Sequence, residues 1–238
     1  MHGWLKKLAG RFLVFEGPDG SGKSTQFKRL ADACREAGVA VTEVREPGGT
    51  GVGERIREVL LDPANDDMEV RCEMLLYMAS RAQLIEQTIR PALKRGELVL
   101  ADRFIASTLA YQGAAGGLDV ASITAVARVA VGNLWPEVNL LFDVDDRTAA
   151  GRLNPLLDRM EQKGVEFHRR VRDGYLQQAS ADPLSWMVID ATRSVDDVTG
   201  QMMRGLQDRF AGGSGGGGSL GARVTVRRIS SDVAARPE

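Results

Sequence analysis

The sequence reads Gly17-Pro18-Asp19-Gly20-Ser21-Gly22-Lys23-Ser24-Thr25 between an apolar run that ends at Glu16 and a helical pattern that begins near residue 22. This stretch fits G-x-x-x-x-G-K-[ST], a pattern typical of loops that bind nucleotide phosphates. Its glycines let backbone N–H groups turn inward around phosphate oxygens, and the helix N-terminus adds a partial positive charge. We therefore expect residues 17–25 to bind a nucleoside triphosphate, with Lys23 reaching its β- and γ-phosphates and Ser24 holding Mg²⁺. The alternative is a glycine-rich turn followed by a lysine by chance.

On both sides of this loop, strand-like and helix-like patterns alternate. Short apolar runs predict strands over residues 11–16, 39–44, 97–101, 138–144 and 186–189. Helical spacing predicts helices over residues 23–37, 69–93, 122–131, 147–153, 161–180 and 195–210, with a bend near Pro91. Strands that are apolar throughout and alternate with helices are typical of a parallel sheet covered on both faces. The sequence therefore predicts an α/β fold with a five-stranded parallel sheet.

Composition limits the classes of function. The 31 lysines and arginines nearly cancel the 32 aspartates and glutamates, so the net charge of −1 excludes a general nucleic-acid binder. The two cysteines, with only two histidines, offer neither a disulfide framework nor a zinc spacing, so we expect a cytoplasmic protein. No run approaches the roughly 18 apolar residues of a membrane span, and the N-terminal apolar run is too short for a signal peptide. We expect no membrane association.

The distribution of glycines along the chain predicts a domain boundary. Seven of the 27 lie within residues 212–221, a Gly/Ser-rich stretch that reads as a flexible linker. We expect one domain over residues 1–211, and a basic, disordered tail over residues 222–238.

Two further landmarks follow predicted strands. Asp102 and Arg103 come at the carboxyl end of the 97–101 strand, where open α/β sheets bind ligands. An aspartate there can hold Mg²⁺ through water and an arginine can bind a phosphate, although a surface ion pair is the plain alternative. Residues Arg45-Glu-Pro-Gly-Gly-Thr50 follow the second strand and alone indicate only a turn.

These elements occur in order with Ser80-Arg81-Ala-Gln83, Asp102-Arg-Phe-Ile-Ala-Ser-Thr-Leu-Ala-Tyr-Gln-Gly113 and Leu157-Asp-Arg-Met-Glu161. Over about residues 11–210 the chain closely resembles the bacterial thymidylate kinases. The resemblance implies a P-loop nucleoside monophosphate kinase fold with a short mobile lid. It also implies MgATP-dependent, direct in-line phosphorylation of dTMP to dTDP, which supplies dTTP for DNA synthesis, and a homodimer.

The resemblance assigns roles to individual positions. Asp19 would accept a hydrogen bond from the sugar 3′-hydroxyl, and Arg57 and Arg103 would hold the acceptor phosphate, two guanidiniums around a dianion. Arg81 would bond the thymine ring, with Tyr77 one helical turn away stacking on it. Tyr111 would crowd the sugar so that a 2′-hydroxyl fits poorly. The remaining substrate positions are Glu46, Pro47, Ser107, Thr108 and Gln112, while Ser24 and Asp102 would hold the metal.

A catalytic arginine is expected from the lid, because Gly20 stands where some relatives carry an arginine. Arg152 is the first candidate and Arg159 the second, beside Lys23, Asp102 and Arg103. For Arg159 the alternative is an ion pair with Asp158 or Glu161. Two other functions stay open at this point: another P-loop nucleoside or nucleotide kinase, and a catalytically weak nucleotide-binding module.

Overall fold

A computed structural model of the protein describes residues 3–152 and 159–211. Most of the expected lid, the expected linker at 212–221 and the expected tail at 222–238 lie outside the described residues.

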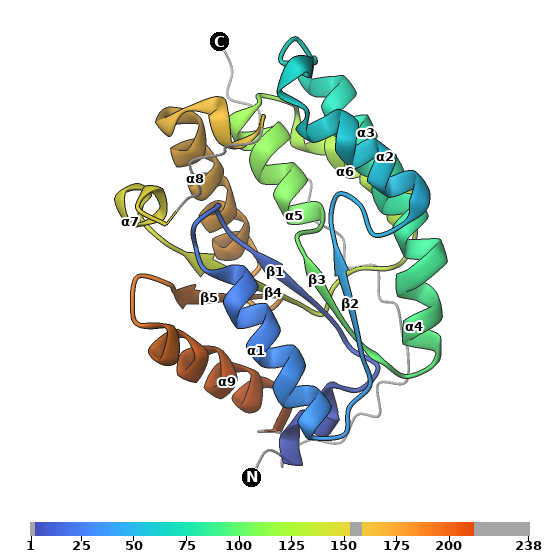
Figure 1. Ribbon diagram of the computed structural model, residues 1–238, viewed down its shortest axis with the longest axis vertical. Helices are drawn as coiled ribbons and strands as arrows, with labels where there is room; N and C mark the ends of the chain where they lie inside the picture. The colour runs from blue at the N-terminus through green and yellow to red at the C-terminus, as the bar shows by residue number, and fades with distance from the viewer. Residues whose placement is uncertain (1–2, 153–158, 212–238) are drawn as a thin grey trace.

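The centre of the molecule is a sheet of five strands that are all parallel, as predicted (Figure 1). The strand order is β2-β3-β1-β4-β5, so β1 pairs with β3 on one side and β4 on the other. The strands are β1 (Phe12–Glu16), β2 (Val41–Arg45), β3 (Leu98–Asp102), β4 (Val138–Asp143) and β5 (Trp186–Asp190).

Alternating side chains of the strands fill two separate cores. Leu13 and Phe15 of β1 pack on one side with Leu30, whereas Phe12 and Val14 pack on the other side with Met78. Because β1 is buried on both faces, it has no polar face to solvent, and its residues 12–15 are all apolar.

Helices cover both faces of the sheet (Figure 1). The core with Leu13 includes α1 and α9, and the cores on the other face include α3, α6 and α8. The helices are α1 (Lys23–Glu36), α2 (Gly51–Leu61), α3 (Val70–Leu84), α4 (Arg90–Lys94), α5 (Ile105–Thr108), α6 (Val120–Val131), α7 (Asp146–Ala150), α8 (Val165–Ala181) and α9 (Val195–Ala211). Short 3-10 turns occupy Gly3–Leu8, Pro63–Asn65 and Glu161–Lys163.

Several helical segments differ from the prediction. The single helix expected over 69–93 is α3 and α4 joined by a π-helical turn over Ile85–Ile89, just before Pro91, whose ring cannot fit the regular ladder. The helix expected over 161–180 is interrupted at Gly164, which has a φ of 81°. Helix α2 was not predicted; Thr50 caps it by accepting a hydrogen bond from the Gly53 N–H at 2.9 Å.

None of the described helices is long and apolar enough to cross a bilayer.

Candidate active site

Two cavities lie at the carboxyl ends of the strands and meet at three residues. The first, about 480 Å³, is lined by the glycine-rich loop and the start of α1; the second, about 240 Å³, lies between α2, α3 and α5. Asp19, Asp102 and Arg103 line both. Two ligands bound in these cavities would therefore approach each other at this junction.

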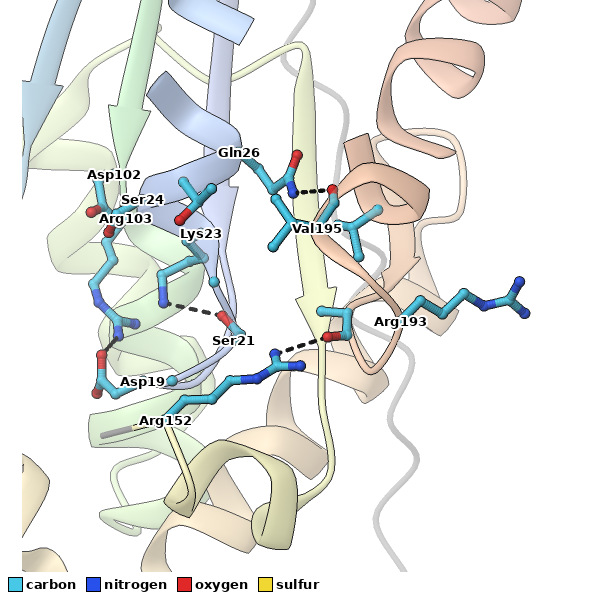
Figure 2. A pocket seen from close by; sticks show the side chains of 15 residues that line it. Asp19, Ser21, Lys23, Ser24, Gln26, Asp102, Arg103, Arg152, Arg193 and Val195 are labelled. Atoms are coloured by element: carbon cyan, nitrogen blue, oxygen red, sulfur yellow. Dashed lines mark hydrogen bonds and ion pairs between the residues drawn. The ribbon is translucent and has the colours of Figure 1, made fainter. Parts of the chain in front are cut away.

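The loop between β1 and α1 forms the floor of the first cavity (Figure 2). A Cβ on Gly17 would lie 2.6 Å from the carbonyl oxygen of Phe142, and one on Gly20 would lie 2.4 Å from that of Ala149. Only glycine lets the loop pass so close to β4 and α7. Gly22, at φ 81°, turns the chain directly into α1.

Lys23 is buried at the base of this loop. Its Nζ donates to the carbonyl oxygens of Gly17 and Pro18, both at 2.9 Å. Burial, reinforced by the Arg103 charge, lowers the pKa of Lys23 to about 8, although Asp19 and Asp102 oppose this shift. An anion beside Nζ would stabilise the charged form, so this is a position where phosphate binding is favourable.

Arg103 lies at the junction, directly after β3. It is the one non-glycine residue with a positive φ, 70°, among those described. Its Nη2 donates to Asp19 Oδ1 at 2.5 Å, and its Nη1 donates to the Gly17 carbonyl oxygen at 3.2 Å and to the Tyr175 hydroxyl at 3.1 Å. Burial opposes ionisation of Asp19, but Arg103 and Lys23 outweigh it and lower its pKa to about 2. A strained backbone held by this many contacts is typical of a functional position.

The second cavity contains a buried ion pair. Arg81 is 1% exposed, and its Nε donates to Glu46 Oε2 at 2.7 Å while Nη2 donates to the Phe104 carbonyl oxygen at 3.1 Å. Burial raises the pKa of Glu46 to about 7, against the charge of Arg81. Thr108 accepts from Arg81 Nη1 at 3.2 Å. The guanidinium is thereby fixed at the wall of the cavity.

The structure brings together most of the positions predicted from the sequence. All eleven expected substrate positions line the second cavity: Asp19, Glu46, Pro47, Arg57, Tyr77, Arg81, Arg103, Ser107, Thr108, Tyr111 and Gln112. Of the loop, residues 19–25 line the first cavity, whereas Gly17 and Pro18 face Lys23 with their carbonyl oxygens.

Comparisons with known proteins agree with this arrangement. A family model described as thymidylate kinase matches residues 15–202. The chain belongs to the thymidylate kinase family. A thymidylate kinase from Deinococcus radiodurans is 47% identical over 204 residues, covering 84% of this chain and 98% of that protein. One from Symbiobacterium thermophilum is 45% identical, covering 84% and 96%. The crystal structure of the thymidylate kinase from Ehrlichia chaffeensis superposes with a TM-score of 0.68 at 32% identity, covering 84% and 97%.

The two lid arginines of this thymidylate kinase family member lie in different places. Arg152 lines the first cavity, and its Nη1 donates to the Ala191 carbonyl oxygen at 2.9 Å (Figure 2). Arg159 lines neither of the two cavities. It is buried, with Nε donating to the Leu60 carbonyl oxygen at 2.8 Å and Nη2 paired with Glu73. Of the alternative partners expected for Arg159, Asp158 lies outside the described residues.

Several residues at the site were not predicted. Glu16 is fully buried; its Oε1 accepts from the Phe104 N–H at 2.9 Å, and its Oε2 accepts from Ser107 Oγ at 2.7 Å and the Tyr175 hydroxyl at 3.0 Å. Burial raises the pKa of Glu16. Glu16 is the one charged residue in the otherwise apolar strand β1, and this pattern could have indicated a functional residue. The sequence contains no comparable signal for Tyr175, which also contacts Arg103, because 72 residues separate the two.

The residues after β5 that line the first cavity were also not predicted from the sequence. Ala191, Arg193 and Val195 line it from the segment between β5 and α9. Arg193 donates from Nε to Asp190 Oδ2 at 2.8 Å, and Figure 2 shows its guanidinium directed away from the loop. The rule that ligands bind at the carboxyl ends of parallel strands pointed to this segment, because it follows β5.

Proposed function

We propose that this protein is a dTMP kinase, which transfers the γ-phosphoryl group of ATP directly to the 5′-phosphate of dTMP. The observation that carries the proposal is the junction of the two cavities at Asp19, Asp102 and Arg103. A donor and an acceptor that meet there need no covalent intermediate. Positioning and charge neutralisation supply most of the catalysis of phosphoryl transfer.

On the donor side, the backbone of the loop and Lys23 would hold the phosphates of ATP. The segment with Ala191, Arg193 and Val195 is placed to contact its nucleoside end. Arg152 is the lid arginine that we assign to the transferring phosphoryl group, because it lines this cavity and Arg159 does not. An arginine in that role contributes on the order of 10³–10⁵ in rate.

Two residues of the donor cavity suit Mg²⁺. Asp102 Oδ1 is buried and has no hydrogen-bond partner in the described part of the chain, which a cation or its bound water would satisfy. The Ser24 residue lines the same cavity. The described residues contain no cluster of three or more metal-binding side chains, and Mg²⁺–nucleotide sites use only one or two protein ligands plus phosphates. Bound there, the ion would neutralise charge on the β- and γ-phosphates.

On the acceptor side, Arg57 and Arg103 would hold the phosphate of dTMP. Arg57 Nη1 donates to the Pro47 carbonyl oxygen at 2.9 Å, which places its guanidinium at the cavity wall. Two cations there reduce the repulsion between the attacking phosphate oxygen and the γ-phosphoryl group. The acceptor phosphate is already ionised, so the reaction requires no general base.

The sugar and base would lie deeper in the second cavity. Tyr111 donates to Asp19 Oδ2 at 3.1 Å, so both groups lie where a deoxyribose 3′-hydroxyl would bind. Arg81, Tyr77, Thr108 and Gln112 line the part that would take the base. Thymine differs from uracil by one methyl group, which an apolar contact discriminates by only about 1–3 kcal/mol. We therefore expect a preference for dTMP over dUMP that is finite.

A coupled assay for ADP release tests the proposal with dTMP, dUMP, dGMP and thymidine as acceptors. We expect dTMP to give the highest kcat/KM. Faster turnover of thymidine would indicate a nucleoside kinase, faster turnover of dGMP another nucleotide kinase, and ATP binding without turnover a binding module. Two expectations stay predictions: a cytoplasmic location, and a homodimer through α6, whose Val129 side chain is 86% exposed.

A further inference from the structure

A buried charge cluster lies beside the second cavity and was not predicted from the sequence. Glu73 of α3 is 1% exposed and stands at its centre. Its Oε1 accepts from Gln112 Nε2 at 2.7 Å. Its Oε2 accepts from Arg159 Nη2 and from Lys163 Nζ, the latter at 3.3 Å. One carboxylate thus joins Gln112, a residue of the base pocket, to the two cations Arg159 and Lys163.

This cluster fixes the polarity of the Gln112 side chain. A carboxylate only accepts hydrogen bonds, so the amide NH₂ of Gln112 must face Glu73. The carbonyl oxygen Oε1 is then the group left for the cavity that Gln112 lines, and no described residue donates to it. Gln112 itself is 2% exposed, so an unpaired amide turned the wrong way is costly at this position.

Pyrimidine bases differ in what they offer such a group. Thymine and uracil carry an N–H donor at N3, whereas cytosine carries an acceptor there. We propose that Glu73 is a positioning residue that makes Gln112 present an acceptor to the base, and so selects bases with a donor at N3. This inference rests on the proposed function of the second cavity as a dTMP site.

Arg159 and Lys163 determine how the amide would be oriented in a Glu73→Gln variant. In Glu73→Gln, the new carbonyl oxygen would face Arg159 and Lys163, because an NH₂ group cannot accept from either cation. Its NH₂ would then face Gln112, whose amide must rotate to offer its carbonyl oxygen. The cavity would receive an NH₂ group, which opposes the N3–H of thymine and suits the N3 acceptor of cytosine.

Isothermal titration with dTMP and with 5-methyl-dCMP tests this in the full-length protein. The two nucleotides share the methyl group and differ at N3 and C4. We expect Glu73→Gln to weaken dTMP binding, to strengthen 5-methyl-dCMP binding, and to change the ratio of the two Kd values by about tenfold or more. The Kd of ATP should not change. An unchanged ratio in a folded variant would overturn the inference.

A matched control and a rescue separate positioning from a general loss of packing. Lys163→Met removes a neighbouring charge but leaves Arg159 and the Gln112 contact, so the Kd ratio should stay as in the unmodified protein. An equal shift in this control would overturn the inference. The exchange Glu73→Gln with Gln112→Glu restores an acceptor toward the base and should return the preference for dTMP.

If Glu73→Gln does not fold, a structure of the unmodified protein still tests the inference. In a crystal structure with dTMP, Gln112 should remain within hydrogen-bond distance of Glu73 with its other amide atom on N3; a separation beyond 3.5 Å would overturn the inference. Failure of the unmodified protein to bind dTMP would instead refute the proposed function. Normal dTMP binding with an unchanged Kd ratio in Glu73→Gln refutes only the role of Glu73.

Discussion

Arg103 lines both cavities. Its guanidinium has fixed partners on three sides: Asp19, the Gly17 carbonyl oxygen, and the hydroxyls of Ser107 and Tyr175. Those hydroxyls also donate to Glu16, so their lone pairs are oriented toward Arg103. A planar fork with several donors fits this geometry, and a lysine ammonium does not.

We therefore expect Arg103→Lys, which keeps the charge, to lower kcat/KM for dTMP by about 100-fold or more, because a bidentate phosphate contact is lost. The Kd of ATP should change by no more than about twofold, since a cation remains beside the loop. Steady-state kinetics and titration with ATP measure the two quantities. Loss of ATP binding with an unchanged KM for dTMP would place Arg103 on the donor side.

Lys23 provides a prediction for pH. Its pKa of about 8 means that a fraction of the side chain is neutral near pH 8. Phosphate oxygens favour the charged ammonium, so ATP binding should raise this pKa and take up protons between pH 7.5 and about 9. Titration in two buffers of different ionisation enthalpy measures the uptake. It should vanish in Lys23→Met, and proton release in the unmodified protein would contradict the assignment.

Site residues that belong to a local sequence pattern could be predicted, whereas those brought to the site only by tertiary contacts could not. Lys23 and Arg103 follow strands at recognisable positions. Glu73 has no such pattern, because its partner Arg159 is 86 residues away. A buried glutamate on a helix looks like a surface residue until its cations are placed beside it.

At the scale of elements, the loop and α7 depend on each other. A Cβ on Gly20 would overlap the Ala149 carbonyl oxygen, whereas one on Gly22 would meet nothing within 4 Å. The two glycines have similar φ values, 76° and 81°, so alanine substitutions at the two positions should cause similar backbone strain and differ in the contact with α7.

We expect Gly22→Ala to cost about 1–2 kcal/mol of folding free energy, the usual cost of a side chain in the left-handed region. Gly20→Ala should cost distinctly more, because it also displaces α7. Chemical denaturation measures both free energies. Equal destabilisation by the two substitutions would show that α7 does not hold the loop.

The boundaries of elements were the weaker part of the prediction. Strands followed the apolar runs to within two residues at each end. The start of β2 was the least accurate of these bounds, and this edge strand exposes Glu43 and Arg45, whereas β1 is buried on both faces. Helix α2 escaped prediction because its N-terminal glycines hide the pattern, and its cap at Thr50 lies inside a stretch that looks like a turn. Gly164 interrupts a periodic stretch for a reason that only its backbone angle reveals.

At the scale of the whole molecule, the five parallel strands were predictable and their order was not. Apolar runs separated by helices imply parallel pairing, but they do not say that β1 lies between β3 and β4. That order has a functional consequence. It sets the loop after β1 beside the end of β3, where Phe15 pairs with Asp102, 87 residues further along the chain. Asp19 from the loop and Arg103 from the end of β3 therefore meet at the junction of the two cavities.

A single ligand that spans both cavities tests this arrangement. Adenosine and thymidine joined through five phosphates would carry the three phosphates of ATP, the one of dTMP, and one that bridges the junction. Because the second half binds intramolecularly once the first is bound, we expect its affinity to exceed that of ATP or dTMP by about 100-fold or more. Arg103→Ala should remove most of this gain, since the bridge passes that side chain. Titration with the linked compound measures both effects, and an affinity no better than that of ATP would mean that the two cavities do not receive the substrates end to end.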